Sequence, residues 1–93
     1  MARYIVIVTD TAKKHLASHY KSGDKALTKR LERIFEELGE HPYEGIGKPK
    51  PLKHNLSGLW SRRIDDKNRL VYRVDEEIIT VLVITAKGHY SLN

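Results

Sequence analysis

Residues 45–73 read GIGKPKPLKHNLSGLWSRRIDDKNRLVYR, and this stretch carries the positive charge of the chain. It holds eight Lys or Arg and two Asp, so its net charge is +6, whereas the whole chain of 93 residues has a formal net charge of +5. The remaining residues therefore sum to −1. A basic stripe confined to one stretch predicts a surface that binds a polyanion. Its basic residues are Lys48, Lys50, Lys53, Arg62, Arg63, Lys67, Arg69 and Arg73.

The second half of this stretch predicts a β-hairpin. The sequence predicts two strands, at residues 59–64 and 69–74, joined by a short polar turn. With a three-residue loop, the register pairs Ile64 with Asn68 and Arg63 with Arg69. Two guanidinium groups directly opposite each other are destabilising. The pair is tolerable if an anion lies between the two groups.

Upstream of the stretch, the N-terminal part predicts a strand and a first helix. Residues 4–8 form a continuous apolar run, which is typical of a strand covered on both faces. Thr9 or Asp10 can cap the helix that follows. Apolar positions then recur at four-residue spacing and predict the core face of that helix: Ala12, Leu16 and Tyr20.

A second predicted helix is the clearest periodic element of the chain. Asp24 follows a Ser-Gly break and is the predicted N-cap, and Gly39 is the predicted stop. A short turn between the two helices predicts an antiparallel hairpin. The apolar stripe of the second helix is Leu27, Leu31, Ile34, Phe35 and Leu38.

The order of the elements predicts the fold class. Residues 41–51 are punctuated by Pro and Gly and are predicted to form a loop. A short strand at 52–56, a turn at 57–58 and a long central strand at 78–85 complete the pattern. One strand, two helices and then three or four antiparallel strands predict an α+β fold, in which a helix pair covers one face of a single sheet.

The composition is that of one small folded domain spanning residues 1–93, being 40% hydrophobic and 31% charged. The chain has no cysteine, which excludes a disulfide framework and a thiolate metal site and suits a reducing cytosol. No stretch approaches the roughly 18 apolar residues of a membrane span. The N-terminus lacks the features of a signal peptide. We therefore expect a cytoplasmic protein with no membrane partner.

We expect the basic stretch and the C-terminal Gly88-His89-Tyr90 to meet in space and form a site that cleaves RNA by its own 2′-OH. That reaction needs a base for the hydroxyl, stabilisation of a pentavalent phosphate and a proton for the 5′-oxygen, all of which side chains can supply. His89 is the best general acid, because histidine titrates near neutral pH; the alternative is an ordinary surface histidine. Arg63 and Arg69 are the best phosphate clamps, because guanidinium binds phosphate bidentately; the alternative is a solvated strand face.

Other residues of the stretch are candidates for binding RNA. Lys50, Lys53 and His54 can guide the backbone or assist proton transfer. Trp60 and Tyr90 can stack on a base, and we assign Trp60 to the core and the stacking role to Tyr90.

No metal site or cofactor is predicted. His15 and His19 have the i, i+4 spacing of a helical metal pair, but no nearby acid or cysteine completes a ligand set. The pair Gly45 and Gly47 is too short for a phosphate-binding fingerprint.

The segment GKPKPLKHNLSGLWSRRIDDKNRLVYRV, followed by KGHY near the C-terminus, resembles the YoeB (Txe) toxins of the RelE/ParE superfamily of bacterial toxin–antitoxin systems. The likeness runs without a gap from residue 42 to residue 74. It implies a microbial-ribonuclease-like α+β fold, a homodimer and cleavage of mRNA in the A site of the 70S ribosome. The implied products are a 2′,3′-cyclic phosphate and a 5′-hydroxyl. A cognate antitoxin with a largely disordered arm would cover the toxin.

Carried over position by position, the resemblance implies roles for several residues. Arg69 would stabilise the phosphate, His89 would be the general acid, and Tyr90 would be the aromatic that shapes the site. The predicted RNA-binding residues, from the resemblance and from the basic stripe together, are Lys53, His54, Arg63, Arg62 and Lys48.

This chain departs from the family at one position. The family pattern GKPEPLKHNL has a glutamate as general base, whereas this chain reads GKPKPLKHNL, with Lys50 in its place. Lysine is a poor base unless burial or neighbouring cations favour its neutral form. Three interpretations stay open: Lys50 is the base, Glu44 replaces it, or the toxin is catalytically weakened. The alternative function is a module that binds RNA or the ribosome without cutting, or that grips another target as ParE-type relatives do.

Overall fold

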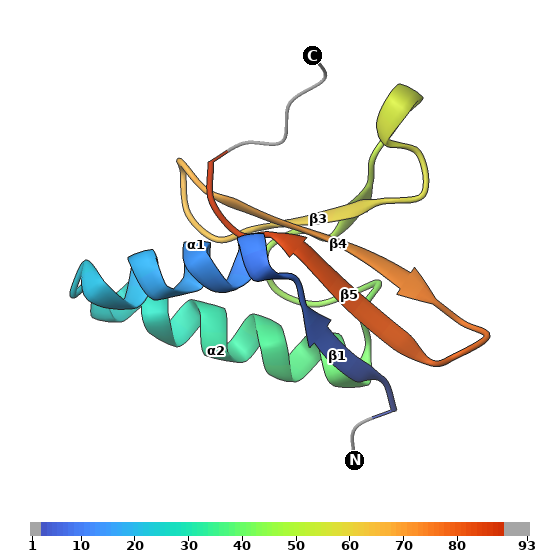
Figure 1. The fold of residues 1–93 in the computed structure, drawn as a ribbon, viewed down its shortest axis with the longest axis horizontal. Coiled ribbons are helices and arrows are strands. Elements are labelled where there is room, and N and C mark those ends of the chain that lie inside the picture. The colour runs from blue at the N-terminus through green and yellow to red at the C-terminus, as the bar shows by residue number, and fades with distance from the viewer. Residues whose placement is uncertain (1–2, 89–93) are drawn as a thin grey trace.

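The computed structural model of the chain describes residues 3–88 and has an α+β architecture. Both helices cover one face of a five-stranded sheet (Figure 1), as the sequence predicted. In chain order the elements are β1 (Ile5–Val8), α1 (Asp10–Lys21), α2 (Lys25–Glu40), β2 (Lys50–Pro51), a short 3₁₀ helix (His54–Leu56), β3 (Trp60–Arg63), β4 (Arg69–Asp75) and β5 (Thr80–Thr85).

The sheet has the strand order β1-β5-β4-β3-β2. Strand β1 runs parallel to β5, and every other pair is antiparallel. Alternate residues of β1 point to opposite faces of the sheet, so Ile5 is 66% exposed and Ile7 is 47% exposed, while Val6 and Val8 pack on the core. The prediction that this strand is covered on both faces is therefore wrong, since the helices cover one face only.

The predicted hairpin register is confirmed. Arg63 pairs with Arg69, and the Ile64 N–H donates to the Asn68 carbonyl at 2.9 Å. The Asp65 carboxylate closes the loop by accepting hydrogen bonds from the N–H groups of Lys67 (2.9 Å) and Asn68 (2.7 Å). Partial burial acts to raise the pKa of Asp65, but these hydrogen bonds outweigh it and lower the pKa. The loop is thus built around an ionised aspartate.

The core forms between α2 and the sheet, as its apolar stripe predicted. Asp24 caps α2 by accepting a hydrogen bond from the Leu27 N–H at 3.0 Å. The helix continues through Gly39 to Glu40, so the predicted stop at Gly39 is wrong. The reason is that Gly39 is buried, and its carbonyl accepts the N–H groups of Arg3 and Tyr4 at the start of β1. The core residues of α2 and the sheet include Leu27, Leu31, Ile34, Leu38, Leu70, Tyr72, Val81 and Val83, with Phe35 packed against them.

Two local predictions fail where tertiary contacts decide the outcome. On α1, Tyr20 is 48% exposed and His19 is buried instead, because the His19 ring bonds to the backbone of Ala86. Residues 52–56 do not form a strand, since His54 has a φ of +59° that is incompatible with one. The extra strand is Lys50–Pro51, which pairs with Trp60 and Ser61.

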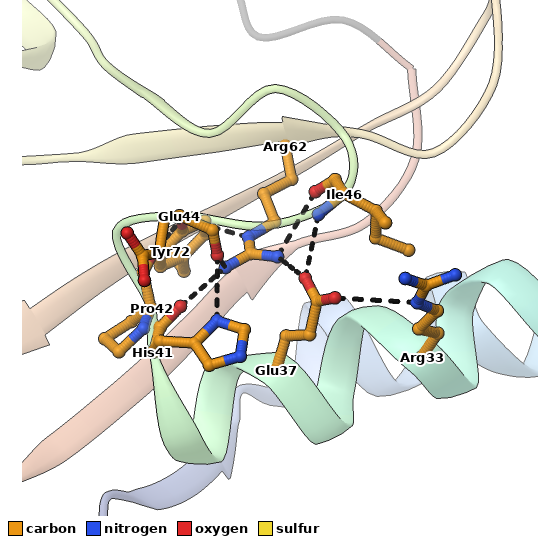
Figure 2. Close-up of polar contacts among 8 residues, drawn as sticks. All are labelled: Arg33, Glu37, His41, Pro42, Glu44, Ile46, Arg62 and Tyr72. Carbon is orange, nitrogen blue, oxygen red and sulfur yellow. Dashed lines mark hydrogen bonds and ion pairs between the residues drawn. The ribbon is translucent and has the colours of Figure 1, made fainter.

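Arg62 lies inside the protein, where its side chain is 0% exposed (Figure 2). This finding corrects the prediction that Arg62 binds RNA. Strand alternation turns Arg62 to the helix side of the sheet, while Arg63 faces the other side. The Arg62 network comprises the Glu37 carboxylate (2.6 Å), the carbonyls of Glu44 (2.7 Å), His41 (3.0 Å) and Ile46 (3.2 Å), and the Tyr72 hydroxyl (3.3 Å).

Truncation of Arg62 should destabilise the fold strongly. We expect Arg62→Ala to lower the free energy of unfolding by about 3–5 kcal/mol, because it leaves the partly buried Glu37 carboxylate with only the exposed Arg33 as a charge partner. Arg63→Ala is the matched control. Its ion pair with Asp66 lies at the surface, so the loss should stay below about 1 kcal/mol. Urea titration of both variants measures the difference, and equal losses would contradict the role of the Arg62 network.

The acid stability of the protein should depend on Glu37. Burial acts to raise the pKa of Glu37, but the hydrogen bond from the Ile46 N–H and the pairing with Arg62 outweigh it and lower the pKa. Because the pKa of Glu37 is lower in the folded protein than in the unfolded chain, the ionised carboxylate stabilises the fold at pH values above its unfolded-state pKa of about 4.3. That stabilisation is lost as the pH falls through the folded-state pKa.

We therefore expect the free energy of unfolding to fall on acidification below about pH 5, and Glu37→Gln to weaken that dependence. Glu36→Gln, at an exposed neighbouring position of α2, should keep the wild-type dependence. Denaturant titrations at a series of pH values test this, and identical slopes for all three proteins would sink the assignment.

Candidate active site

A basic cleft lies on the face of the sheet that is turned away from the helices. The pairs Lys50–Ser61 and Arg63–Arg69 are in register on neighbouring strands, so these four side chains share that face. The cleft is lined by Gly47, Lys48, Lys50, Ser61, Arg63 and Arg69. Four of the six lining residues are cations and none is an acid, which makes the cleft suitable for a phosphate group.

The loop before β2 brings its lysines to the cleft because Gly47 packs directly on β3. The Gly47 carbonyl accepts the Arg63 N–H at 2.6 Å, and Gly47 has a φ of +83°. A Cβ atom at this position would lie 2.7 Å from the Arg63 carbonyl oxygen. Only glycine fits both the backbone conformation and the contact. Lys48 and Lys50 follow within three residues and therefore enter the cleft.

The two arginines are held in different ways. Arg69 is half-buried, and its Nη1 donates to the carbonyls of Asp65 (3.0 Å) and Asn68 (3.3 Å) in the hairpin loop. Among the described residues no partner is found for its Nε or Nη2. Arg63 pairs with the exposed carboxylate of Asp66. Arg69 is thus preorganised by backbone carbonyls, and it retains N–H donors for an anion.

Besides the buried Arg62, three of the predicted residues lie outside this cleft. Lys53 and His54 are exposed on the segment beyond β2, and neither lines the cleft. Glu44 lines a separate depression together with Tyr43, and its carbonyl is bound to Arg62 on the helix side of the sheet. The structure therefore does not bring Glu44 to Lys50 and Arg69 as a substitute base, because the Arg62 network holds residues 41–46 on the opposite face.

His89 and Tyr90 lie outside the residues that the structure describes. The last described residue, Gly88, is fixed beside Arg69. Its carbonyl accepts the Arg69 N–H, and its own N–H donates to Asn68 Oδ1, both at 2.8 Å. The chain therefore enters residues 89–93 at the edge of the hairpin that carries Arg69.

Sequence reasoning missed the residues that support the cleft. Ser61 lies between Lys50 and Val71 in the register, and its position follows from the hairpin pairing once that is known. Asp65 and Asn68 organise the hairpin loop. Asp and Asn side chains commonly hydrogen-bond to nearby backbone groups in turns, so their presence in the predicted turn was the available sequence signal. Trp60 was assigned to the core, and it packs there with Tyr43 at a ring-centroid distance of 5.0 Å.

Within residues 3–88 no cluster of three or more His, Asp or Glu is arranged to hold a metal ion. His15 and His19 instead direct ring nitrogens to the backbone of Ala86. Neither of the two helices has the length and apolar character of a membrane span within the described part of the chain.

Comparison with known proteins identifies the family. The model of the family described as YoeB-like toxin of bacterial type II toxin–antitoxin system matches residues 10–90. A YoeB toxin from Streptomyces coelicolor is 44% identical over 73 residues, which cover 77% of this chain and 83% of that protein. The chain therefore belongs to the YoeB-like toxins of bacterial type II toxin–antitoxin systems, as the resemblance in residues 42–74 implied.

Solved structures agree in fold and show how relatives assemble. A YoeB dimer from Staphylococcus aureus superposes with a TM-score of 0.78 at 33% identity, covering 96% of this chain and 100% of that one. A YoeB–YefM complex from the same organism gives a TM-score of 0.76 at 32% identity, with the same coverage. The α+β fold expected from the sequence, with a helix pair on one face of a single sheet, is thus confirmed and matches that of YoeB toxins.

The contact of Gly47 with β3 should make this glycine irreplaceable. We expect Gly47→Ala to lower the free energy of unfolding by about 1–3 kcal/mol more than Gly58→Ala, since an added methyl must displace the Arg63 carbonyl. Gly58 is the matched control, because it also has a positive φ (+93°) but has open space around it. Thermal or urea denaturation measures both variants, and equal losses would show that backbone strain alone matters.

Proposed function

We propose that this chain is a ribosome-dependent endoribonuclease that cuts mRNA in the A site through attack of the 2′-OH on the adjacent phosphate. The observation that carries the proposal is the opposed pair Arg63 and Arg69 in a cleft lined by four cations, with Gly88 bonded beside Arg69. Membership of the YoeB-like toxins supports a ribonuclease.

The arginines would act on the phosphate. A phosphate seated between Arg63 and Arg69 relieves the repulsion between two guanidinium groups placed directly opposite each other. As the 2′-oxygen attacks phosphorus, negative charge builds on the non-bridging oxygens, and preorganised guanidinium donors stabilise it. Arg69 is the better placed of the two, because hairpin carbonyls hold it and no carboxylate competes for it within the described residues.

We assign the two proton transfers to His89 and Lys50. His89 follows Gly88 directly and is proposed to give its proton to the departing 5′-oxygen, with Tyr90 stacking on a base. Lys50 lies in the cleft at the position of the family's glutamate, and we propose that it takes the 2′-OH proton in its neutral form. The products are then a 2′,3′-cyclic phosphate and a 5′-hydroxyl, with no metal ion in the scheme.

The partners follow from the relatives. Structures of a YoeB dimer and of a YoeB–YefM complex support a homodimer and a cognate antitoxin for this chain. An acidic antitoxin arm suits the cationic cleft, where it would exclude RNA. The exposed Lys53 and His54 are proposed to guide the RNA backbone toward the cleft, in the cytoplasm where ribosomes are.

Mapping mRNA 5′ ends in a reconstituted translation reaction tests the proposal. We expect cleavage within the A-site codon by the wild type and a loss on the order of 100- to 1,000-fold for Arg69→Ala and for His89→Ala. Lys50→Ala should also lose activity, and Lys50→Glu should restore it if a carboxylate base fits the same position. Arg73→Ala is the matched control, because Arg73 is exposed on the same face of β4 but outside the cleft.

Two outcomes would count against this function. If the wild type arrests ribosomes without new 5′ ends, the chain is a binding toxin and the catalytic assignment is wrong. If folded Arg69→Ala still cuts at the wild-type rate, the phosphate lies elsewhere.

A further inference from the structure

Two histidines of α1 hold the segment that follows β5. The Ala86 N–H donates to Nδ1 of His15 at 3.1 Å, and the Ala86 carbonyl accepts a hydrogen bond from Nε2 of His19 at 2.7 Å. Ala86 is fully buried, so its two backbone groups need partners within the protein. Strand β5 ends at Thr85, one residue before Ala86. The two histidine side chains, one helical turn apart on α1, supply both partners.

The hairpin loop holds the same segment from its other side. Asn68 Oδ1 accepts the Gly88 N–H, and the Asn68 amide donates to the Asp65 carboxylate at 3.0 Å. Gly88 has a φ of +69°, the left-handed conformation that glycine adopts readily. Residues 86–88 are therefore fixed between α1 and the hairpin loop that precedes Arg69 (Figure 1).

We propose that His15 and His19 are positioning residues for the catalytic C-terminal segment. By holding both backbone groups of Ala86, they set the point beside Arg69 from which the chain leaves toward His89. This inference rests on the proposed function, in which residue 89 delivers a proton to the leaving oxygen. Since a displacement of about 1 Å can cost on the order of 100-fold in rate, fixing this point matters for catalysis.

The two hydrogen bonds require defined protonation states. Nδ1 of His15 accepts an N–H only when that ring is neutral, whereas Nε2 of His19 must carry a proton to donate to a carbonyl. Among the described residues, the charged groups near the pair are Lys87 and Asp65. Lys87 lies near His15 and bonds to Ser18, and the Asp65 carboxylate lies near His19.

Burial, together with Lys87 and His19, lowers the pKa of His15 below the ordinary histidine value. His15 is therefore neutral at neutral pH. The contact with Ala86 is present above the pKa of His15 and is lost as the pH falls through it.

Amide hydrogen exchange at Ala86 reports the first contact directly. We expect the protection factor of the Ala86 amide to fall by 10- to 100-fold in His15→Leu and to be retained in His15→Asn, whose Oδ1 can stand in for Nδ1 as acceptor. Acidification from pH 7.5 to 5 should reduce that protection in the wild type but leave His15→Asn unchanged. Lys14→Leu, on the exposed side of α1, is the matched control.

Single-turnover cleavage on programmed ribosomes reports the consequence. His15→Leu should reduce the maximal rate by 10- to 100-fold with ribosome affinity unchanged, and His15→Asn should recover it to within about threefold. His19→Gln, which keeps a donor near the Nε2 position, should likewise stay close to wild type. Thermal unfolding confirms that each variant is folded.

The outcomes separate this inference from the proposed function. If folded His15→Leu keeps both the Ala86 protection and the cleavage rate, the positioning role is wrong. If the protection falls but the rate does not, the histidines hold the segment without serving catalysis, and the inference is again overturned. If the wild type does not cut at all, the proposed function fails, and the exchange data alone decide whether the histidines hold Ala86.

Discussion

The buried guanidinium of Arg62 is the interaction on which the arrangement of the cleft depends. A charge removed from water costs several kcal/mol unless it is paired and fully hydrogen bonded. Glu37 balances the charge, and three carbonyls from residues 41–46 take up donors that would otherwise be unsatisfied. The same contacts fix this loop against α2, so that residues 47–50 leave it toward the other face of the sheet (Figure 2).

Two adjacent arginines therefore serve opposite purposes. The period of two along β3 sends Arg62 into the interior and Arg63 to the cleft. The first pairs with Glu37 in the interior, and the second is a cation of the cleft that is costly to place opposite Arg69 without an anion. The net charge of +6 in residues 45–73 consequently overstates the charge that a ligand meets, because one of its members is neutralised inside the protein.

Features that depend on neighbouring residues could be predicted from the sequence. The hairpin register, the Asp24 cap and the apolar stripe of α2 follow from spacing and side-chain type. The meeting of Lys50 with Arg63 and Arg69 in one cleft was instead implied by the family resemblance. Features that depend on distant backbone groups could not.

The burial of Arg62 and of His19 is such a case, because their acceptors are mainly carbonyls that no sequence pattern reveals. The edge position of β1 depends on strand order, which local alternation does not fix. The position of Glu44 likewise depends on distant contacts, because the bond of its carbonyl to Arg62 holds its loop on the helix side of the sheet. Sequence spacing alone therefore left Glu44 open as a base.

The parallel pairing of β1 with β5 has a consequence for biosynthesis. Ile5 pairs with Thr80 and Val8 with Val83, so the first strand of the chain has no partner until the last strand has been made. Contacts of such high sequence separation form late and slow folding, because a long loop must close first. The α2 stripe and the β3–β4 hairpin can form earlier, from contacts close in sequence. During translation β1 therefore lacks its partner strand until β5 has been made, which ties the completion of the sheet to the synthesis of β5.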